Sequence, residues 1–238
     1  MKISVYPTSD YVEDRDIKDR IVVVIDVLRA TSTIITALYN GCKEVIPTAD
    51  IESAVNISKN YERDGFILGG ERNAVKIEGF HLSNSPREYS RERVENKTVL
   101  ITTTNGTKAI TRALDAKEVV LASFINISAV YEYIAAAGSD ISIICAGTMG
   151  KFSADDILVA GALIKGLEDK GVSLQLDDLG MVAKRMYLNS KDDLHGALSE
   201  TLHYSILKDL GPQGDLDDCL KLDTAPIVPI YSDGVVRA

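Results

Sequence analysis

Residues Val22–Ile34 read VVVIDVLRATSTI, an apolar β-branched run followed by a short polar loop and then by apolar residues at helical spacing. The run Ile21–Ile25 has no polar interruption, which is typical of a strand buried on both faces of a sheet. It stops at Asp26, and the apolar positions after the loop predict a helix over Thr31–Tyr39. The segment therefore predicts a strand, a loop and a helix in succession.

Two further segments, Val99–Ile110 and Ile143–Gly161, repeat this design. The alternation predicts an α/β fold, a three-layer sandwich with a largely parallel or mixed sheet and pseudo-repeated strand-loop-helix units. We expect an edge strand at Ile3–Tyr6 and a closing strand at Ile227–Ile230. The pattern allows a single domain over residues 1–238, or two pseudo-repeated lobes within it. Ligands of such sheets bind beyond the carboxyl ends of the strands, where helix N-termini favour phosphate groups.

The composition argues against several classes of partner. With 238 residues, 45% of them hydrophobic, the chain can bury a sizeable core. Its formal net charge of −9 argues against nucleic acids and anionic membranes, which are bound through clustered lysines and arginines. No apolar run approaches the roughly 20 residues of a membrane-spanning helix, and the N-terminus does not resemble a signal peptide. Three separated cysteines favour reduced thiols, so we expect a cytoplasmic protein. The polar loops at the strand ends favour a small anion as its substrate.

Asp26 closes the buried strand and is followed three residues later by Arg29, just before the expected helix start at Thr31. A carboxylate in this place can hold a divalent metal or attack phosphorus, while the helix start takes phosphate oxygens. The alternative is a capping Asp that pairs with Arg29. Haloacid dehalogenase phosphatases also carry an Asp after their first strand, but they need a second Asp two residues later. Leu28 stands at that position here, which disfavours that family.

Two polar loops follow other predicted strands. Thr102–Thr107 offers hydroxyls and an Asn-Gly turn that can present several donors to one oxyanion, or serve only as a capped turn. The loop Gly147–Ser153 lacks the spacing of a P-loop, so ATP binding is not expected.

Acidic residues occur next to two of these strand ends. Asp155 and Asp156 lie in the first turn of a long helix, where they either complement the helix dipole or form a magnesium site. Glu71 and Arg72 follow Gly69-Gly70, and the Arg72 guanidinium can bind phosphate, carboxylate or sulfonate in a fork. Either pair could contribute to binding an anion together with its metal.

Six motifs, in this order, resemble the 2-phosphosulfolactate phosphatase family. They are VVVIDVLRATSTI at 22–34, GGER at 69–72, NSPREY at 84–89, TTTNGT at 102–107, SFIN at 123–126 and ICAGTMGKFSADD at 144–156, with His203 following. The resemblance implies a magnesium-dependent phosphatase that converts 2-phospho-3-sulfolactate to 3-sulfolactate and phosphate, a step toward coenzyme M.

The resemblance also implies a site. Mg²⁺ would be held by Asp26 and some of Glu71, Asp155 and Asp156. The catalytic residues are expected to be Asp26, Arg29, Glu71, Arg72 and His203. The expected substrate-binding residues are Thr31, Ser32, Asn84, Ser85, Arg87, Thr103, Thr104, Asn105, Gly106, Asn126, Gly147, Thr148 and Lys151.

Alternatives stay open at this point. The substrate could be another small phospho-acid, such as phosphoglycolate or phosphoglycerate, and a non-catalytic phospho-acid-binding module would need the arginines and threonines but not the surplus carboxylates. Asp26 could attack phosphorus directly, or a metal-bound water could attack with a carboxylate as base. Small α/β metabolic enzymes are often symmetric oligomers, so a homodimer is compatible with this class.

Overall fold

The computed structural model describes residues 1–210, 212 and 214–238. Its strands are β1 (Lys2–Tyr6), β2 (Ile21–Ile25), β3 (Glu44–Pro47), β4 (Phe66–Arg72), β5 (Val75–Lys76), β6 (Thr98–Thr102), β7 (Glu118–Ala122), β8 (Ile141–Cys145), β9 (Gln175–Leu176), β10 (Ile230–Ser232) and β11 (Val235–Arg237). Its helices are α1 (Asp14–Ile17), α2 (Ala30–Tyr39), α3 (Ile51–Ser58), α4 (Arg91–Val94), α5 (Gly106–Arg112), α6 (Ile127–Ala137), α7 (Ala154–Asp169), α8 (Asp178–Ser190), α9 (Leu194–Leu198), α10 (Leu202–Leu210) and α11 (Asp215–Cys219), with short 3-10 turns η1 (Ser9–Tyr11), η2 (Pro86–Glu88) and η3 (Phe124–Asn126).

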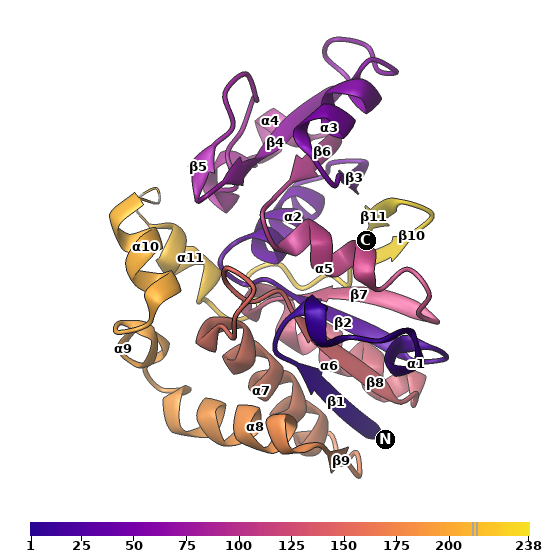
Figure 1. The fold of residues 1–238 in the computed structure, drawn as a ribbon, viewed down its shortest axis with the longest axis vertical. Coiled ribbons are helices and arrows are strands. Elements are labelled where there is room, and N and C mark those ends of the chain that lie inside the picture. Colours follow the sequence, from indigo (N-terminus) through magenta and orange to yellow (C-terminus); the bar gives the residue numbers. More distant parts are fainter. Residues whose placement is uncertain (211, 213) are drawn as a thin grey trace.

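The strands form one sheet of eleven, in the order β5-β4-β6-β3-β11-β10-β7-β2-β8-β1-β9 (Figure 1). Helices α2 and α5 pack on one face of its centre, and α6 and α7 pack on the other. Strand β2 is buried throughout: Ile21, Val23 and Ile25 contribute to one core, whereas Val22 and Val24 contribute to the opposite one. The predictions of a three-layer α/β sandwich with a mixed sheet and of a doubly buried strand are therefore confirmed.

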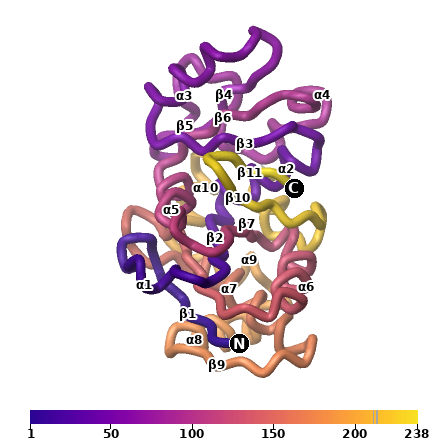
Figure 2. The backbone as a smooth tube through the Cα atoms, turned by 90° about the vertical axis from the view of Figure 1, so that its right-hand side faces the viewer, coloured from indigo at the N-terminus to yellow at the C-terminus, as the bar shows by residue number. Residues whose placement is uncertain are grey.

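The sheet consists of two parallel halves that a C-terminal hairpin joins. Strands β4, β6 and β3 are parallel to one another, as are β7, β2, β8, β1 and β9. Between the halves, β11 is antiparallel to β3, β10 is antiparallel to β11, and β7 is antiparallel to β10. In Figures 1 and 2 this yellow hairpin lies between the violet β3 and the pink β7. The two halves therefore run in opposite directions.

The twist of the sheet brings the carboxyl ends of the two halves together. Five neighbour-to-neighbour steps separate β6 from β2. At roughly 20–25° per step, these steps rotate one half against the other by roughly 100–125°. Strands that would point to opposite edges of a flat sheet are thereby turned until their ends converge, and residues after β2, β4, β6 and β8 can share one site.

Two details of the expected order are corrected. Strand β1 is not at the edge, because it pairs with β8 on one side and with the two-residue β9 on the other. Strand β10 begins at Ile230, where the predicted closing strand ended, and it forms a hairpin with β11 whose turn holds Asp233 and Gly234 at positive φ. Within the described residues, no helix is both long and apolar enough to span a bilayer.

Candidate active site

A pocket of about 300 Å³ opens where the carboxyl ends of the strands converge. The loops after β2, β4, β6 and β8 line one side of it, and α10 lines the other, facing them in Figure 1. Its polar lining residues are Asp26, Arg29, Glu71, Asn73, Asn84, Thr104, Asn105, Thr148 and His203, and its apolar ones are Leu28, Ala74, Met149, Ile206, Leu207 and Leu210.

Asp26 lies at the end of β2 and is only 7% exposed. Its Oδ1 accepts a hydrogen bond from the amide of Ala30 at 3.2 Å, and its Oδ2 lies so close to Gly106 that a Cβ there would be 2.7 Å away. Burial raises the pKa of Asp26 to about 6, and this effect outweighs the opposing charge of His203. Asp26 is thus a carboxylate held in place through one oxygen, with the other oxygen beside the loop that follows β6.

His203, on α10, pairs with a buried carboxylate of α7. Its Nδ1 lies 2.9 Å from Oδ2 of Asp155, and Asp155 also accepts a hydrogen bond from the hydroxyl of Ser153. Burial by itself lowers the pKa of His203, but the hydrogen bond and charge of Asp155 outweigh it and raise this pKa overall. Since Nδ1 is occupied, Nε2 is the ring nitrogen available to a ligand. Asp155 therefore orients an imidazole that favours its protonated form.

Asp156, one residue further along α7, makes different contacts. Its Oδ1 accepts from the amide of Val27 at 3.0 Å and its Oδ2 from the amide of Gly147 at 2.9 Å. Burial and the charge of Asp155 raise its pKa well above the ordinary value. The side chain links the loop after β2 to the loop after β8 and does not line the pocket.

Glu71 fixes the loop after β6 against β4. Its Oε1 accepts from the amide of Thr104 at 2.7 Å, and its Oε2 accepts from the amide of Ala74 at 2.7 Å and from the Thr104 hydroxyl at 3.2 Å. The Thr104 amide, expected to bind phosphate, is therefore engaged within the protein. Glu71 still lines the pocket, and three accepted bonds leave part of the capacity of a carboxylate unused.

Arg29, at the start of α2, is 2% exposed and forms a buried ion pair. Its Nη1 lies 2.5 Å from Oδ2 of Asp215, and the other oxygen of Asp215 accepts a hydrogen bond from the Ser85 hydroxyl at 2.6 Å. Among the described residues, the buried Nε of Arg29 and the buried Oδ1 of Asn84 have no hydrogen-bond partner. Both residues line the pocket, so a ligand can supply the missing partners.

Comparison with known proteins assigns the family. The profile of the 2-phosphosulpholactate phosphatase family matches residues 6–234. The chain belongs to this family. A relative from Caldanaerobacter subterraneus subsp. tengcongensis, named probable 2-phosphosulfolactate phosphatase, is 47% identical over 100% of this chain and 98% of its own. Relatives of the same name from Clostridium tetani (45% identical, 100% of both chains) and Clostridium beijerinckii (44% identical, 99% of both) agree. The resemblance drawn from the six motifs is confirmed, and the chain is a phosphoric monoester hydrolase.

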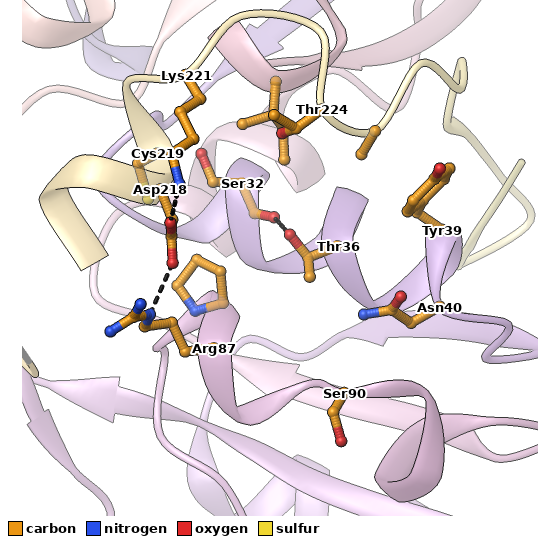
Figure 3. A pocket seen from close by; sticks show the side chains of 13 residues that line it. Ser32, Thr36, Tyr39, Asn40, Arg87, Ser90, Asp218, Cys219, Lys221 and Thr224 are labelled. Atoms are coloured by element: carbon orange, nitrogen blue, oxygen red, sulfur yellow. Dashed lines mark hydrogen bonds and ion pairs between the residues drawn. The ribbon is translucent and has the colours of Figure 1, made fainter. Parts of the chain in front are cut away.

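Within this phosphatase, two of the expected substrate-binding residues line a different pocket, of about 310 Å³ (Figure 3). Arg87 is ion-paired there with Asp218, which also binds Lys221. Ser32 donates to the carbonyl of Val27 and contacts the Ser123 hydroxyl. These contacts place Arg87 and Ser32 outside the site that contains Asp26.

Several other expected residues support the loops of the phosphatase site. Arg72 donates to the Glu71 carbonyl and to the Thr102 hydroxyl, and it does not line the pocket. Lys151 lines a neighbouring hollow with His203. The remaining members of this group make buried backbone contacts: Thr31 with the Asp26 backbone, Thr103 with Thr107, Asn126 with the carbonyls of Leu121 and Ile227, and Gly147 with Asp156.

The pocket offers two carboxylates, Asp26 and Glu71, to a divalent cation. Across the described residues, no three His, Cys, Asp or Glu side chains are arranged to hold a metal ion. Mg²⁺ does not need such a cage, because it keeps several waters and is often held by one or two carboxylates together with substrate phosphates. Oδ2 of Asp26 accepts no hydrogen bond from any described residue, which suits it to this role. Asp155 and Asp156 are engaged elsewhere, so the ligand set that fits is Asp26 with Glu71.

Sequence reasoning missed part of the site. Asp215 lies in the acidic run DLDD at 215–218, which resembles a solvated helix face and carries no motif. The apolar residues of α10, Ile206, Leu207 and Leu210, also gave no signal, because helical spacing of this kind usually indicates core packing.

Proposed function

We propose that this phosphatase hydrolyses 2-phospho-3-sulfolactate to 3-sulfolactate and phosphate, and that it requires Mg²⁺. One observation carries the proposal: the imidazole of His203, oriented by buried Asp155, lines the same pocket as the carboxylate of Asp26 and the guanidinium of Arg29. A proton donor, a hard oxygen ligand and an oxyanion binder together meet the needs of phosphate ester cleavage. The names of the relatives supply the substrate.

The charges around the pocket support the need for a cation. Asp26 and Glu71 contribute carboxylates, and the charge of Arg29 is offset by its buried partner Asp215. A substrate with phosphate, sulfonate and carboxylate groups would be repelled by such a lining. Bound Mg²⁺ would supply positive charge that offsets the lining and polarises the phosphoryl oxygens.

His203 is proposed to act on the leaving group. Its Nε2–H donates a proton to the C2 oxygen of the substrate as the bond between phosphorus and that oxygen breaks, so the product leaves as an alcohol. Asp155 keeps Nδ1 protonated and stabilises the imidazolium before transfer. An alkoxide is a poor leaving group, so this proton transfer is worth about 10²–10⁴ in rate.

Asp26 is proposed to act on the phosphorus side, by one of two routes. In the first, a carboxylate oxygen of Asp26 bonds to phosphorus as the alcohol departs, and water then cleaves the acyl phosphate. In the second, the carboxylate takes a proton from the water that attacks phosphorus. A substrate with a chiral phosphorus distinguishes them, because two displacements retain the configuration and one inverts it.

The substrate is tested by measuring phosphate release from 2-phospho-3-sulfolactate and phosphoglycolate, with Mg²⁺ and then with excess EDTA. Fast, chelator-sensitive release that favours the sulfonate is expected. Release from phosphoglycolate alone would keep the chemistry and overturn the substrate. Release from neither would leave a binding module as the better interpretation.

The role of His203 is tested with His203→Gln on two substrates. We expect the variant to lose about 10²–10⁴-fold on the sulfolactate ester but far less on p-nitrophenyl phosphate, whose leaving group needs no proton. His195→Gln is the matched control, because His195 contacts Tyr204 outside the pocket and should leave both rates unchanged. Equal losses on both substrates would show that His203 does not protonate the leaving group.

A further inference from the structure

A buried hydrogen-bonded chain of three side chains, Arg29–Asp215–Ser85, connects three separate segments beside the pocket. Asp215 opens α11, and its two oxygens are divided between the guanidinium of Arg29 and the hydroxyl of Ser85. All three residues are at most 2% exposed. Arg29 and Asp215 are 186 positions apart in the chain. A buried ion pair of this kind is costly to desolvate, so its presence beside an active site favours a functional reason.

The geometry of the pair leaves one edge of the guanidinium unused. Asp215 engages Nη1, whereas neither Nε nor Nη2 of Arg29 hydrogen-bonds to any described residue. A guanidinium presents its donors as a planar fork, and the Nε–Nη2 edge can grip an oxyanion through two parallel hydrogen bonds. Because Arg29 lines the pocket, an oxyanion bound there would also satisfy the buried Nε.

We propose that Asp215 is a positioning residue that locks Arg29 so that its Nε–Nη2 edge receives an oxyanion of the substrate, with Ser85 fixing Asp215 in turn. The inference rests on the proposed function, since it places the substrate in this pocket. The oxyanion is the phosphoryl group or the sulfonate. Both have three oxygens of tetrahedral geometry, and the experiment separates them.

The first experiment is a double-mutant cycle with Arg29→Met and Asp215→Asn, read as kcat/KM. A misplaced binding group costs on the order of 100-fold, so each single variant should lose about that much. The double variant should lose no more than about threefold beyond the worse single one, because Asp215 acts only through Arg29. Losses that multiply, or an Asp215→Asn variant within twofold of wild type, would overturn the proposal.

Asp218→Asn is the matched control, because Asp218 lies one turn further on α11 and binds Arg87 and Lys221 in the other pocket. It should change kcat/KM less than twofold. If Asp215→Asn fails to fold, Ser85→Ala takes its place in the cycle, with an expected loss of about tenfold that disappears in the Arg29→Met background.

A second measurement reports on positioning directly. Guanidinium chloride, added far below denaturing concentrations, should restore part of the activity of Arg29→Ala because Asp215 is present to hold the ion. It should restore none to the Arg29→Ala/Asp215→Asn variant. Equal rescue of both variants would show that Asp215 does not position the guanidinium.

Binding measurements identify the oxyanion and separate this proposal from the substrate assignment. Calorimetry with orthophosphate and with 3-sulfolactate, each in the presence of Mg²⁺, should show that Asp215→Asn weakens one of them by at least tenfold. That anion marks the group at Arg29. If wild type releases no phosphate from phosphosulfolactate yet Asp215→Asn still weakens orthophosphate, the substrate assignment fails and the positioning role stands. If neither affinity changes, the positioning role fails.

Discussion

Adjacent residues Asp155 and Asp156 should give opposite phenotypes when replaced by alanine. Asp156 accepts hydrogen bonds from two buried backbone amides, those of Val27 and Gly147. An unsatisfied buried amide costs about 1–3 kcal/mol, so Asp156→Ala should lower the free energy of unfolding by about 2–6 kcal/mol. With an m-value of about 2 kcal/mol/M, the urea midpoint should fall by roughly 1–3 M.

Among the described residues, Asp155 is hydrogen-bonded to the side chains of His203 and Ser153, and Ser153 keeps a hydroxyl contact with Thr148 when Asp155 is removed. Asp155→Ala should therefore cost only about 1 kcal/mol of stability, while it should lower kcat by about 100-fold because His203 loses its orienting partner. Urea unfolding and steady-state kinetics on the two variants give the comparison. Measurements with and without Mg²⁺ show whether either residue contributes to metal binding.

An Asp156→Ala midpoint within about 0.3 M of wild type would refute the reasoning. If Asp156→Ala has normal stability but no longer binds Mg²⁺, Asp156 is a ligand of the metal together with Asp26 and Glu71. Asp156→Asn is the informative intermediate, since its amide oxygen can accept from one of the two backbone amides whereas its NH2 group cannot accept from the other. It should lie between wild type and Asp156→Ala.

Three further predictions concern Asp26 and its neighbour Gly106. Asp26→Asn should abolish turnover with an unchanged circular dichroism spectrum, and near-normal activity would overturn the central assignment. Because burial raises the pKa of Asp26 from 3.8 to about 6, the metal-free folded state retains a proton that the unfolded state releases. The free energy of unfolding of the metal-free enzyme should thus fall by about 3 kcal/mol as the pH rises from about 4 to beyond 6. Urea titrations at each pH measure this dependence, and Asp26→Asn should lack it. Gly106→Ala places a Cβ 2.7 Å from Oδ2 of Asp26 and 2.5 Å from Cβ of Ala30. We therefore expect kcat to fall by about 100-fold and the free energy of unfolding to fall by about 1–3 kcal/mol. Thermal melts and kinetics indistinguishable from wild type would contradict this close packing.

The sequence predicted the local units of the fold but not their assembly. The predicted strand Ile21–Ile25 is β2 and the predicted helix Thr31–Tyr39 is nearly all of α2, because an uninterrupted β-branched run and apolar residues at helical spacing are clear local signals. The hairpin was missed although Asp233-Gly234 is a strong turn signal, because its strands are three residues each and too short to show a period. The opposed direction of the two halves follows from that hairpin and has no local signature.

The site divides in the same way. Asp26, Arg29 and Glu71 could be singled out because they follow apolar runs in the sequence, where charged residues are unusual, and all three line one pocket. Asp155 and Asp156 could not be told apart, because both are acidic residues in a first helical turn and only tertiary contacts separate them. The contact between Asp215 and Arg29 could not be predicted, because the two residues are 186 positions apart and only the folded chain brings them together. The homodimer, the single domain, Mg²⁺ and the individual site roles stay predictions.

The position of the hairpin in the chain also affects how the enzyme matures. The strands at residues 230–237 are synthesised after all the other described strands, and they lie between β3 and β7. Until they emerge, a nascent chain that has formed both half-sheets carries two strands whose edge N–H and C=O groups are unpaired, the kind of surface that recruits other chains. A chain that stalls or is released before residue 230 would lack the hairpin that joins the half-sheets, and the loops that form the pocket would not meet.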